Sequence, residues 1–229
     1  MSTRDGGTSA APWASLNLGT GVGDGARPVA RNRALFAARL DGARPVFLHQ
    51  VHGARVQRID AATPSDTIEA DAAITTEPRV ACTIQVADCL PVLLADRAGR
   101  AVGAAHAGWR GLAGGVLDAT VAALRDAGAA DPIAWLGPCI GARRFEVGDE
   151  VRAAFGSRSE RRFVAHLRKD GTPGWLADLA GLAEDRLRAL GLKSIGRDGG
   201  CTFEDGSRFF SFRRDGVTGR LAAAVWLRG

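Results

Sequence analysis

Short apolar runs, separated by Gly, Pro and Asp, dominate the first half of the chain and predict β-strands. Further runs of this kind follow in the second half. We expect strands at residues 45–51, 55–60, 72–76, 80–86, 90–95, 133–136, 208–212 and 221–227. A doubly wound parallel sheet would need a crossover helix between nearly every pair of strands, and residues 45–108 leave no room for them.

Apolar positions recur at helical spacing in three other segments. The first is residues 28–40, where Pro28 suits an initial helical position. The second and third are residues 109–127 and 175–190, and a glycine follows each of them. Strands and helices therefore mix without strict alternation, which predicts an α+β fold with mixed sheets.

No internal repeat or low-complexity linker divides the chain, so we expect one domain over residues 1–229. Its 46% hydrophobic composition allows a substantial core. No apolar run approaches the roughly 20 residues of a membrane-spanning helix, and the N-terminus lacks the apolar stretch of a secretory signal. We therefore expect no membrane partner and a cytoplasmic location.

Charge and cysteine content narrow the possibilities further. The net charge is +5, and only Lys169 and Lys193 among the 30 basic residues are lysines. The densest basic stretch, residues 152–169, also carries Glu160 and few aromatic residues, so we interpret it as a solvated face rather than a nucleic-acid surface. The four cysteines form no C-x-x-C pair, which favours reduced thiols.

Candidate chemistry begins with histidine, because the chain has only four. His49 and His52 are three positions apart, so on an extended strand they point to opposite faces. His106 ends an apolar run before a Gly-rich junction, and Cys89 lies between two predicted strands. Zinc prefers imidazole and thiolate, and a catalytic site uses three protein ligands plus water. His52, Cys89 and His106 meet this demand, although spacing alone, which forms no local metal motif, favours buried structural residues.

Two further polar positions have alternative interpretations. Asp88 beside Cys89 is a candidate to orient a ligand histidine or to carry a proton, and it also suits the cap of a turn. Arg213 follows an apolar run, where a guanidinium suits phosphate or carboxylate binding as well as an ordinary surface pair.

Several ordered motifs together resemble the laccase-domain family, whose members are also described as multicopper polyphenol oxidase-like proteins, peptidoglycan-editing factors and zinc-containing purine nucleoside phosphorylases. The resemblance spans almost the whole chain. It rests on Ser2-Thr3-Arg4-Asp5-Gly6-Gly7, Ser15-Leu16-Asn17-Leu18-Gly19, Gln50-Val51-His52-Gly53, Ala87-Asp88-Cys89-Leu90-Pro91-Val92, His106-Ala107-Gly108-Trp109-Arg110-Gly111, Gly137-Pro138-Cys139-Ile140-Gly141, and residues 209–216 with Thr218-Gly219-Arg220.

The resemblance implies that His52, Cys89 and His106 hold zinc and that His49 does not. It also implies a layered α/β/β/α fold, phosphorolysis of adenosine, inosine, guanosine and methylthioadenosine, and hydrolytic deamination of adenosine. The partners are then a purine nucleoside and phosphate, bound by a monomer or weak homo-oligomer. The catalytic candidates are Asp88, Cys89 and His106, and the substrate or phosphate candidates are Arg4, Asn17, Arg110 and Arg213. One departure is Arg144-Phe145, where relatives commonly carry Cys-Tyr.

Two alternatives stay open at this stage, and a third is discounted. A multicopper oxidase needs a blue-copper site and a histidine-rich cluster, which four histidines cannot supply, although the same three ligands can take up copper. Cys89 activated by His106 would instead make a thiol hydrolase or amidase that edits peptidoglycan precursors. The arginines would finally suit a nucleic-acid-binding module, whose binding would depend steeply on salt.

Overall fold

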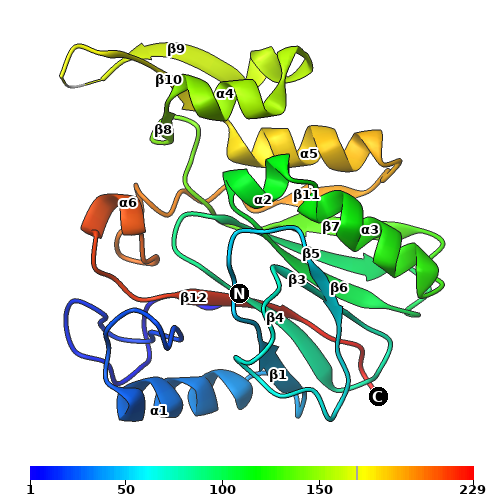
Figure 1. Ribbon diagram of the computed structural model, residues 1–229. Helices are drawn as coiled ribbons and strands as arrows, with labels where there is room; N and C mark the ends of the chain where they lie inside the picture. Colours follow the sequence, from blue (N-terminus) through cyan, green and yellow to red (C-terminus); the bar gives the residue numbers. More distant parts are fainter. Residues whose placement is uncertain (169) are drawn as a thin grey trace.

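Two stacked β-sheets form the centre of the molecule in the computed structural model, which describes residues 1–168 and 170–229 (Figure 1). The larger sheet has six strands in the order β11-β7-β5-β6-β3-β2. Only the outer pairs, β2 with β3 and β7 with β11, run parallel. These strands are β2 (Val56–Arg58), β3 (Ala72–Thr75), β5 (Leu90–Asp96), β6 (Val102–Ala107), β7 (Pro132–Leu136) and β11 (Ile195–Arg197).

The smaller sheet has β4 (Val80–Val86) at its centre, with β1 (Arg44–Phe47) parallel to it and β12 (Leu221–Val225) antiparallel. Side chains of β4 alternate between the two faces of this sheet, as the strand period requires. Cys82 and Ile84 enter the core between the sheets, whereas Ala81 joins the core on the outer face. The larger sheet meets them with Val102 and Ala104 of β6.

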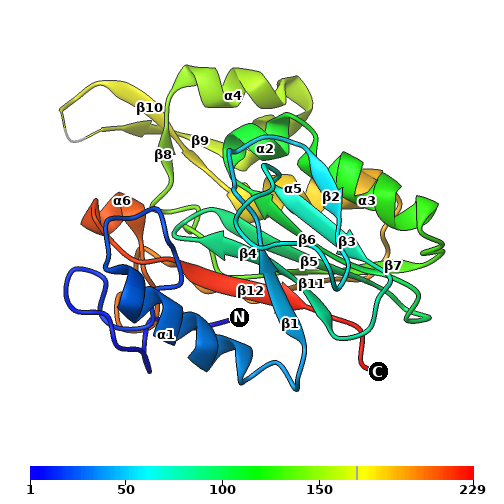
Figure 2. The same ribbon diagram turned by 60° about the horizontal axis from the view of Figure 1, so that its bottom comes forward.

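Helices cover the outer faces of both sheets (Figures 1 and 2). Helix α1 (Ala26–Ala37) places Phe36 against the smaller sheet. Helices α3 (Val116–Asp126) and α5 (Leu179–Ala189) cover the larger sheet, and α3 contributes Leu117, Val121 and Leu124 to that core. The order helix, sheet, sheet, helix confirms the predicted α+β layers with mixed sheets.

A third, antiparallel sheet stands apart from these layers, beyond α5 in Figure 1. It consists of β8 (Glu146–Val147), β9 (Phe163–Leu167) and β10 (Pro173–Ala177), in the order β8-β10-β9. Helix α4 (Asp149–Phe155) and the 3-10 helix η1 (Ser157–Arg162) lie between β8 and β9 in the chain. The basic stretch 152–169 belongs largely to this region, and its Arg152 and Arg162 form ion pairs there with Glu160, Asp178 and Asp185.

All three predicted helices have different bounds in the structure. Helix 28–40 is α1, which begins two residues earlier and ends at Ala37. Helix 175–190 begins only at Leu179, because residues 175–177 belong to β10 and the Asp178 carboxylate accepts a hydrogen bond from Gly181 N as the N-cap. Helix 109–127 is broken into α2 (Trp109–Ala113) and α3 by Gly115, whose φ of 91° lies outside the helical region.

The predicted strand 208–212 is wrong. Phe209 and Phe210 are buried in an irregular segment, and Ser211 caps the short helix α6 (Phe212–Asp215) by accepting a hydrogen bond from Arg214 N. Their apolar character therefore reflects burial rather than strand pairing. No helix among the described residues is both long and apolar enough to cross a membrane.

Candidate metal centre and adjoining cavity

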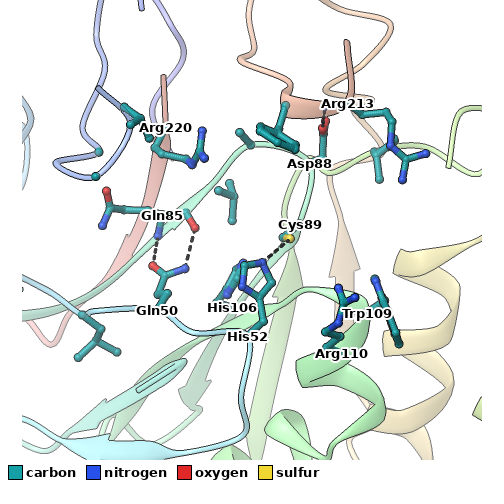
Figure 3. Close-up of a pocket in the computed structure, with 18 of the residues that line it drawn as sticks. Gln50, His52, Gln85, Asp88, Cys89, His106, Trp109, Arg110, Arg213 and Arg220 are labelled. Atoms are coloured by element: carbon teal, nitrogen blue, oxygen red, sulfur yellow. Dashed lines mark hydrogen bonds between the residues drawn. The ribbon is translucent and has the colours of Figure 1, made fainter. Parts of the chain in front are cut away.

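His52, Cys89 and His106 meet where three chain segments end, and their ligand atoms all lie within 4.8 Å of one another (Figure 3). Antiparallel pairing of β5 with β6 aligns Pro91 with His106, so Cys89, just before β5, reaches the same place. His52 does not extend a strand as predicted: β1 ends at Phe47, and His52 lies in a bend with φ of 62°. This bend turns its ring toward Cys89, with 3.9 Å between Nε2 and Sγ.

A buried carboxylate, that of Asp71, fixes two of these three residues. Its Oδ1 accepts hydrogen bonds from His106 Nδ1 at 2.8 Å and from His52 N at 2.9 Å, and Oδ2 accepts one from Gly53 N at 2.7 Å. Because Nδ1 of His106 is bound to Asp71, Nε2 is left as the ligand atom. Histidine ligands of metal ions are ordinarily oriented in this way.

Gly108 has no side chain, and this leaves room for the side chains of the three donor residues. A Cβ atom on Gly108 would lie 2.9 Å from Cys89 Sγ and 3.0 Å from His52 Cδ2. Any side chain at this position would therefore enter the volume between the thiolate and the imidazole. The donor set of two nitrogens and one sulfur, with a carboxylate behind one imidazole and no Cβ in the way, fits a borderline-soft divalent ion such as zinc.

Charges and hydrogen bonds within the site favour the anionic form of the Cys89 thiol. Burial alone would raise the pKa of Cys89, but the positive charge of His106 and hydrogen bonds from both histidines lower it to about 6. Burial would lower the pKa of His106, and the Cys89 charge and the Asp71 hydrogen bond raise it instead to about 9. By contrast, burial raises the pKa of the Cys82 and Cys139 thiols. Cys89 is thus prepared as an anionic ligand.

The three residues open into a cavity of about 560 Å³, a size typical of small-molecule sites. Its lining is partly apolar and aromatic, with Trp109, Phe145, Ile140 and Leu179. Three guanidinium groups, those of Arg110, Arg213 and Arg220, also line it, as does the glycine-rich segment 19–22. The cavity therefore offers a flat apolar surface and positive charge beside the same donor set.

Arg110 and Arg213 lie on the aromatic side of the cavity. The Arg110 guanidinium is 4.2 Å from the centre of the Trp109 ring, and the Arg213 guanidinium is 5.5 Å from that of Phe145. Arg213 Nη1 also donates to Glu146 O at 2.8 Å. Both arginines line a second cavity of about 360 Å³ beside α4. The structure thus brings two of the predicted anion-binding residues to the site.

Comparison with known proteins identifies the family. Residues 1–228 match the family described as multi-copper polyphenol oxidoreductase laccase. The chain belongs to this family. It is 48% identical to purine nucleoside phosphorylase PA4543 of Pseudomonas aeruginosa, covering 100% of this chain and 92% of the relative. It is 45% identical to purine nucleoside phosphorylase YfiH of Escherichia coli, covering 99% and 92%.

Solved structures show the same architecture. The crystal structure of Neisseria meningitidis protein NMB0706 has a TM-score of 0.89 at 42% identity and covers 99% of this chain and 92% of its own. The hypothetical protein YfiH of Bacillus licheniformis has a TM-score of 0.90 at 30% identity, covering 99% and 91%. The fold of this laccase-family chain is therefore shared along its whole length.

Asp88 of this laccase-family chain joins three segments at the cavity. Its Oδ1 accepts a hydrogen bond from Thr202 Oγ1 at 2.7 Å, its Oδ2 accepts one from Arg213 N at 2.6 Å, and its carbonyl accepts one from Ile140 N. Both carboxylate oxygens are therefore engaged. These contacts suit a residue that positions its neighbours, and proton transfer by Asp88 stays a prediction.

Arg4 and Asn17 do not line the cavity. The three guanidinium nitrogens of Arg4 donate to the carbonyls of Ala14 and Gly206. Asn17 is fully buried and holds backbone groups of Gly19 and Arg220. Asn17 therefore supports two residues of the cavity wall from behind, whereas Arg4 joins segments that do not line the cavity.

Sequence reasoning missed Asp71 and Arg220 as site residues. The available signal for Asp71 was an acid directly before the apolar strand β3, because an acidic residue is rarely buried unless it has a specific partner. Arg220 belongs to the Thr218-Gly219-Arg220 motif, but nothing in the sequence places its guanidinium in the cavity. His49 also lines the cavity but is not part of the three-residue donor set.

Proposed function

We propose that this laccase-family protein is a zinc-dependent purine nucleoside phosphorylase that accepts adenosine, inosine, guanosine and methylthioadenosine. One observation carries the proposal: a two-histidine, one-cysteine donor set opens into a cavity with both an aromatic wall and guanidinium groups. The names of the relatives from Pseudomonas aeruginosa and Escherichia coli support it. A purine needs the flat apolar wall, and phosphate needs the cations.

The metal is proposed as zinc because the ligands are imidazole and thiolate in the number that catalytic zinc sites use. When bound there, zinc would supply a Lewis acid and lower the pKa of a coordinated water. The chain's own contribution is rigidity. Asp71 fixes His106 and the His52 backbone, and Gly108 keeps the space between the ligands open.

Phosphorolysis exchanges one bond at the C1′ carbon of the ribose. A phosphate oxygen forms a bond to C1′ while the bond from C1′ to the purine nitrogen breaks, and the base leaves with that electron pair and takes up a proton. The protein contributes by holding both reactants at C1′ and by stabilising the phosphate charge. We place the purine against Phe145 and Trp109, with Arg110 and Arg213 raising the positive potential beside it.

The same donor set supports deamination of adenosine as a second reaction. In that reaction a water oxygen bonds to C6 of the purine and ammonia leaves, and nucleobase deaminases use a zinc ion held by histidine and cysteine for it. For Asp88 we propose a positioning role in both reactions, because Thr202 and Arg213 already occupy its two oxygens.

One assay separates these reactions. Zinc-loaded protein is incubated with adenosine, with and without phosphate, and adenine, inosine and hypoxanthine are resolved by chromatography. Adenine that appears only with phosphate supports phosphorolysis. Inosine alone would restrict the proposal to deamination, and the absence of all three products would overturn it.

Metal content tests the ligand assignment directly. His106→Ala should lose stoichiometric zinc and turnover, whereas His49→Ala should keep zinc, because His49 lies outside the donor set. Elemental analysis of both purified variants gives the answer. Equal metal loss in the two variants, or stoichiometric copper in the native protein, would contradict the zinc assignment.

A thiol hydrolase is the competing proposal, because Cys89, His106 and Asp71 also form a chain of nucleophile, base and carboxylate. It predicts amidase activity toward peptidoglycan precursors in metal-free protein, and alkylation of Cys89 should abolish that activity. A phosphorolysis reaction that disappears with the metal and returns with zinc would exclude it as the main function.

A further inference from the structure

Among the described residues, Arg220 forms no ion pair with a carboxylate, and its side chain lines the cavity. It precedes β12, and the metal ligands line the same cavity (Figure 3). Nη1 donates to Thr218 O and Gly219 O, both at 3.2 Å, while Nε and Nη2 have no acceptor among the described residues. Burial lowers the pKa of Arg220, and the nearby charges of Cys89 and Asp88 offset only part of this shift. A guanidinium in this position favours an anion.

The glycine-rich segment 19–22 lines the cavity beside Arg220. A Cβ atom on Gly19 would lie 2.7 Å from Arg220 Cγ, so the loop lies directly against the arginine stem. Within the described part of the chain, the backbone N–H groups of Thr20, Gly21 and Val22 donate to no acceptor. Free N–H groups of a glycine-rich loop next to a cation are the arrangement that holds phosphate oxygens in many proteins.

Asn17 joins the loop and the arginine into one unit. Its Oδ1 accepts hydrogen bonds from Gly19 N at 2.9 Å and from Arg220 N at 2.8 Å. Its Nδ2 donates to Gly19 O at 3.2 Å and to Asp24 Oδ2 at 2.9 Å. Because Asn17 is fully buried, this connection is rigid, and the cation and the loop are held in place before any ligand arrives.

The position of Arg220 also suits the direction of the proposed reaction. In Figure 3 it lies on the opposite side of the metal ligands from Trp109 and Arg110. When one group displaces another at C1′ with inversion, the incoming and leaving groups occupy opposite faces of the sugar. With the purine on the aromatic wall, the incoming phosphate therefore belongs on the Arg220 side, and not beside Arg110 or Arg213.

We propose that Arg220 and the backbone of residues 19–22 form the binding site for free inorganic phosphate. Asn17 is a positioning residue for this site and does not touch the anion. The assignment rests on the proposed phosphorylase function for its biological meaning, but it is tested by phosphate binding itself.

The test is titration of zinc-loaded protein with inorganic phosphate by isothermal calorimetry. Arg220→Met keeps the aliphatic stem against Gly19 and the backbone N–H that Asn17 binds, and removes the charge. We expect its Kd for phosphate to rise about 10- to 100-fold, the value of one or two charge-assisted hydrogen bonds. Zinc content and adenosine affinity should stay unchanged, and Arg220→Lys should recover part of the affinity.

Arg31→Met is the matched control, because Arg31 is an exposed residue of α1 and the substitution removes the same charge. It should bind phosphate as the native protein does. Arg110→Met and Arg213→Met should weaken phosphate binding less than Arg220→Met does. In turnover, Arg220→Met should raise the KM for phosphate and leave the KM for adenosine unchanged.

Two results would overturn the assignment: phosphate affinity of Arg220→Met within twofold of the native value, or an equal loss in Arg220→Met and Arg213→Met. Arg220→Met that loses affinity for adenosine 5′-monophosphate but not for inorganic phosphate would also overturn it. If native protein binds phosphate through Arg220 but releases no adenine, the phosphorylase proposal fails while this site stands.

Discussion

Two residues, Asp71 and Gly108, set the geometry of the candidate metal centre. Asp71 orients His106 and holds the backbone on both sides of His52, so two ligands from distant parts of the chain share one carboxylate. Gly108 lies against the third ligand, Cys89, and against the His52 ring. The donor geometry is therefore set by the protein before an ion binds.

Gly108→Ala should weaken zinc binding about 10- to 100-fold, the range for disturbed support of a ligand. The added methyl group would lie within 3.0 Å of Cys89 Sγ and His52 Cδ2, and these must move to admit it. Competition against a chromophoric chelator measures the affinity. Gly196→Ala is the control, because its nearest neighbour would be 3.7 Å away. Equal zinc affinity in the two variants would contradict this interpretation of Gly108.

For single residues, the sequence predicted the three donors better than it predicted the residues around them. The scarcity of histidine drew attention to all four histidines, and the family resemblance selected His52 and His106. The structure brings both of these to Cys89. Motif membership also selected Arg4 and Asn17, yet a motif does not show which way a side chain points. Arg4 donates to backbone carbonyls, and Asn17 holds the backbone of Gly19 and Arg220. Asp71, the buried carboxylate that does position two of the donor residues, lies outside the motifs.

Among the elements, η1 and α5 are held together by a cluster of ion pairs. Arg162 contacts both Asp178, the N-cap of α5, and Asp185 within that helix. Arg161 also contacts Asp185. Hydrogen bonds from Arg162 are the main cause that lowers the pKa of Asp185 to about 2. The charged face predicted for residues 152–169 thus includes specific contacts that fix the edge of the third sheet.

Asp185→Asn should lower the free energy of unfolding at pH 7 by about 1 kcal/mol. This is the contribution of a hydrogen bond to a charged group after it is reduced by solvent screening. The folded pKa of Asp185 is lowered, so its contribution is present above the unfolded value of about 4 and disappears as pH falls toward 2. Urea unfolding across this range should show the two proteins converging in acid.

Asp126→Asn is the control for that experiment, because Asp126 is exposed and makes no ion pair within the described residues. It should change the free energy of unfolding little at any pH. A difference between Asp185→Asn and the native protein that stays constant from pH 7 to pH 3 would show that the Asp185 charge is not the cause.

The apolar periodicity correctly predicted the existence of the helices, but it did not predict where they begin and end. The stripe of α3 was visible, but the break at Gly115 depends on a backbone conformation that apolar periodicity does not report. Trp175 and Leu176 fit the helical stripe of α5 equally well, yet their pairing with β8 and β9 places them in a strand. Phe209 and Phe210 have strand-like composition without any strand partner among the described residues. In each case tertiary contacts overrode local preference.

Across the whole molecule, stability depends on the contact between the two stacked sheets. Ile84 of β4 is fully buried in the core that both sheets share, close to Val102 and Ala104 of the same cluster. Strand β12 completes the sheet that carries Ile84 by pairing with β4. In this pairing Leu221 lies opposite Val86, which is 135 residues earlier in the chain. Such pairing cannot be read from local patterns, so the layered arrangement came from the family resemblance.

Ile84→Ala should lower the free energy of unfolding by about 2–5 kcal/mol, because it leaves a cavity where the surroundings cannot collapse easily. Ile84→Val should cost only about 0.5–1.5 kcal/mol. Val164→Ala on the exposed face of β9 should have little effect, since Val164 is 64% exposed. Urea unfolding of the three variants checks the order, and similar losses at Ile84 and Val164 would contradict the importance of the shared core.

The order of the site residues along the chain has a consequence for biosynthesis. All three metal donors precede residue 107, whereas Arg213 and Arg220 lie within the last twenty residues. A ribosome therefore releases every donor well before the residues that complete the anion-binding wall. Strand β12 follows Arg220 directly and completes the smaller sheet. A message with a late premature stop codon would therefore yield a polypeptide that carries all three donors but lacks this buried strand, so that metal capture and substrate turnover would be lost together by nonsense mutation.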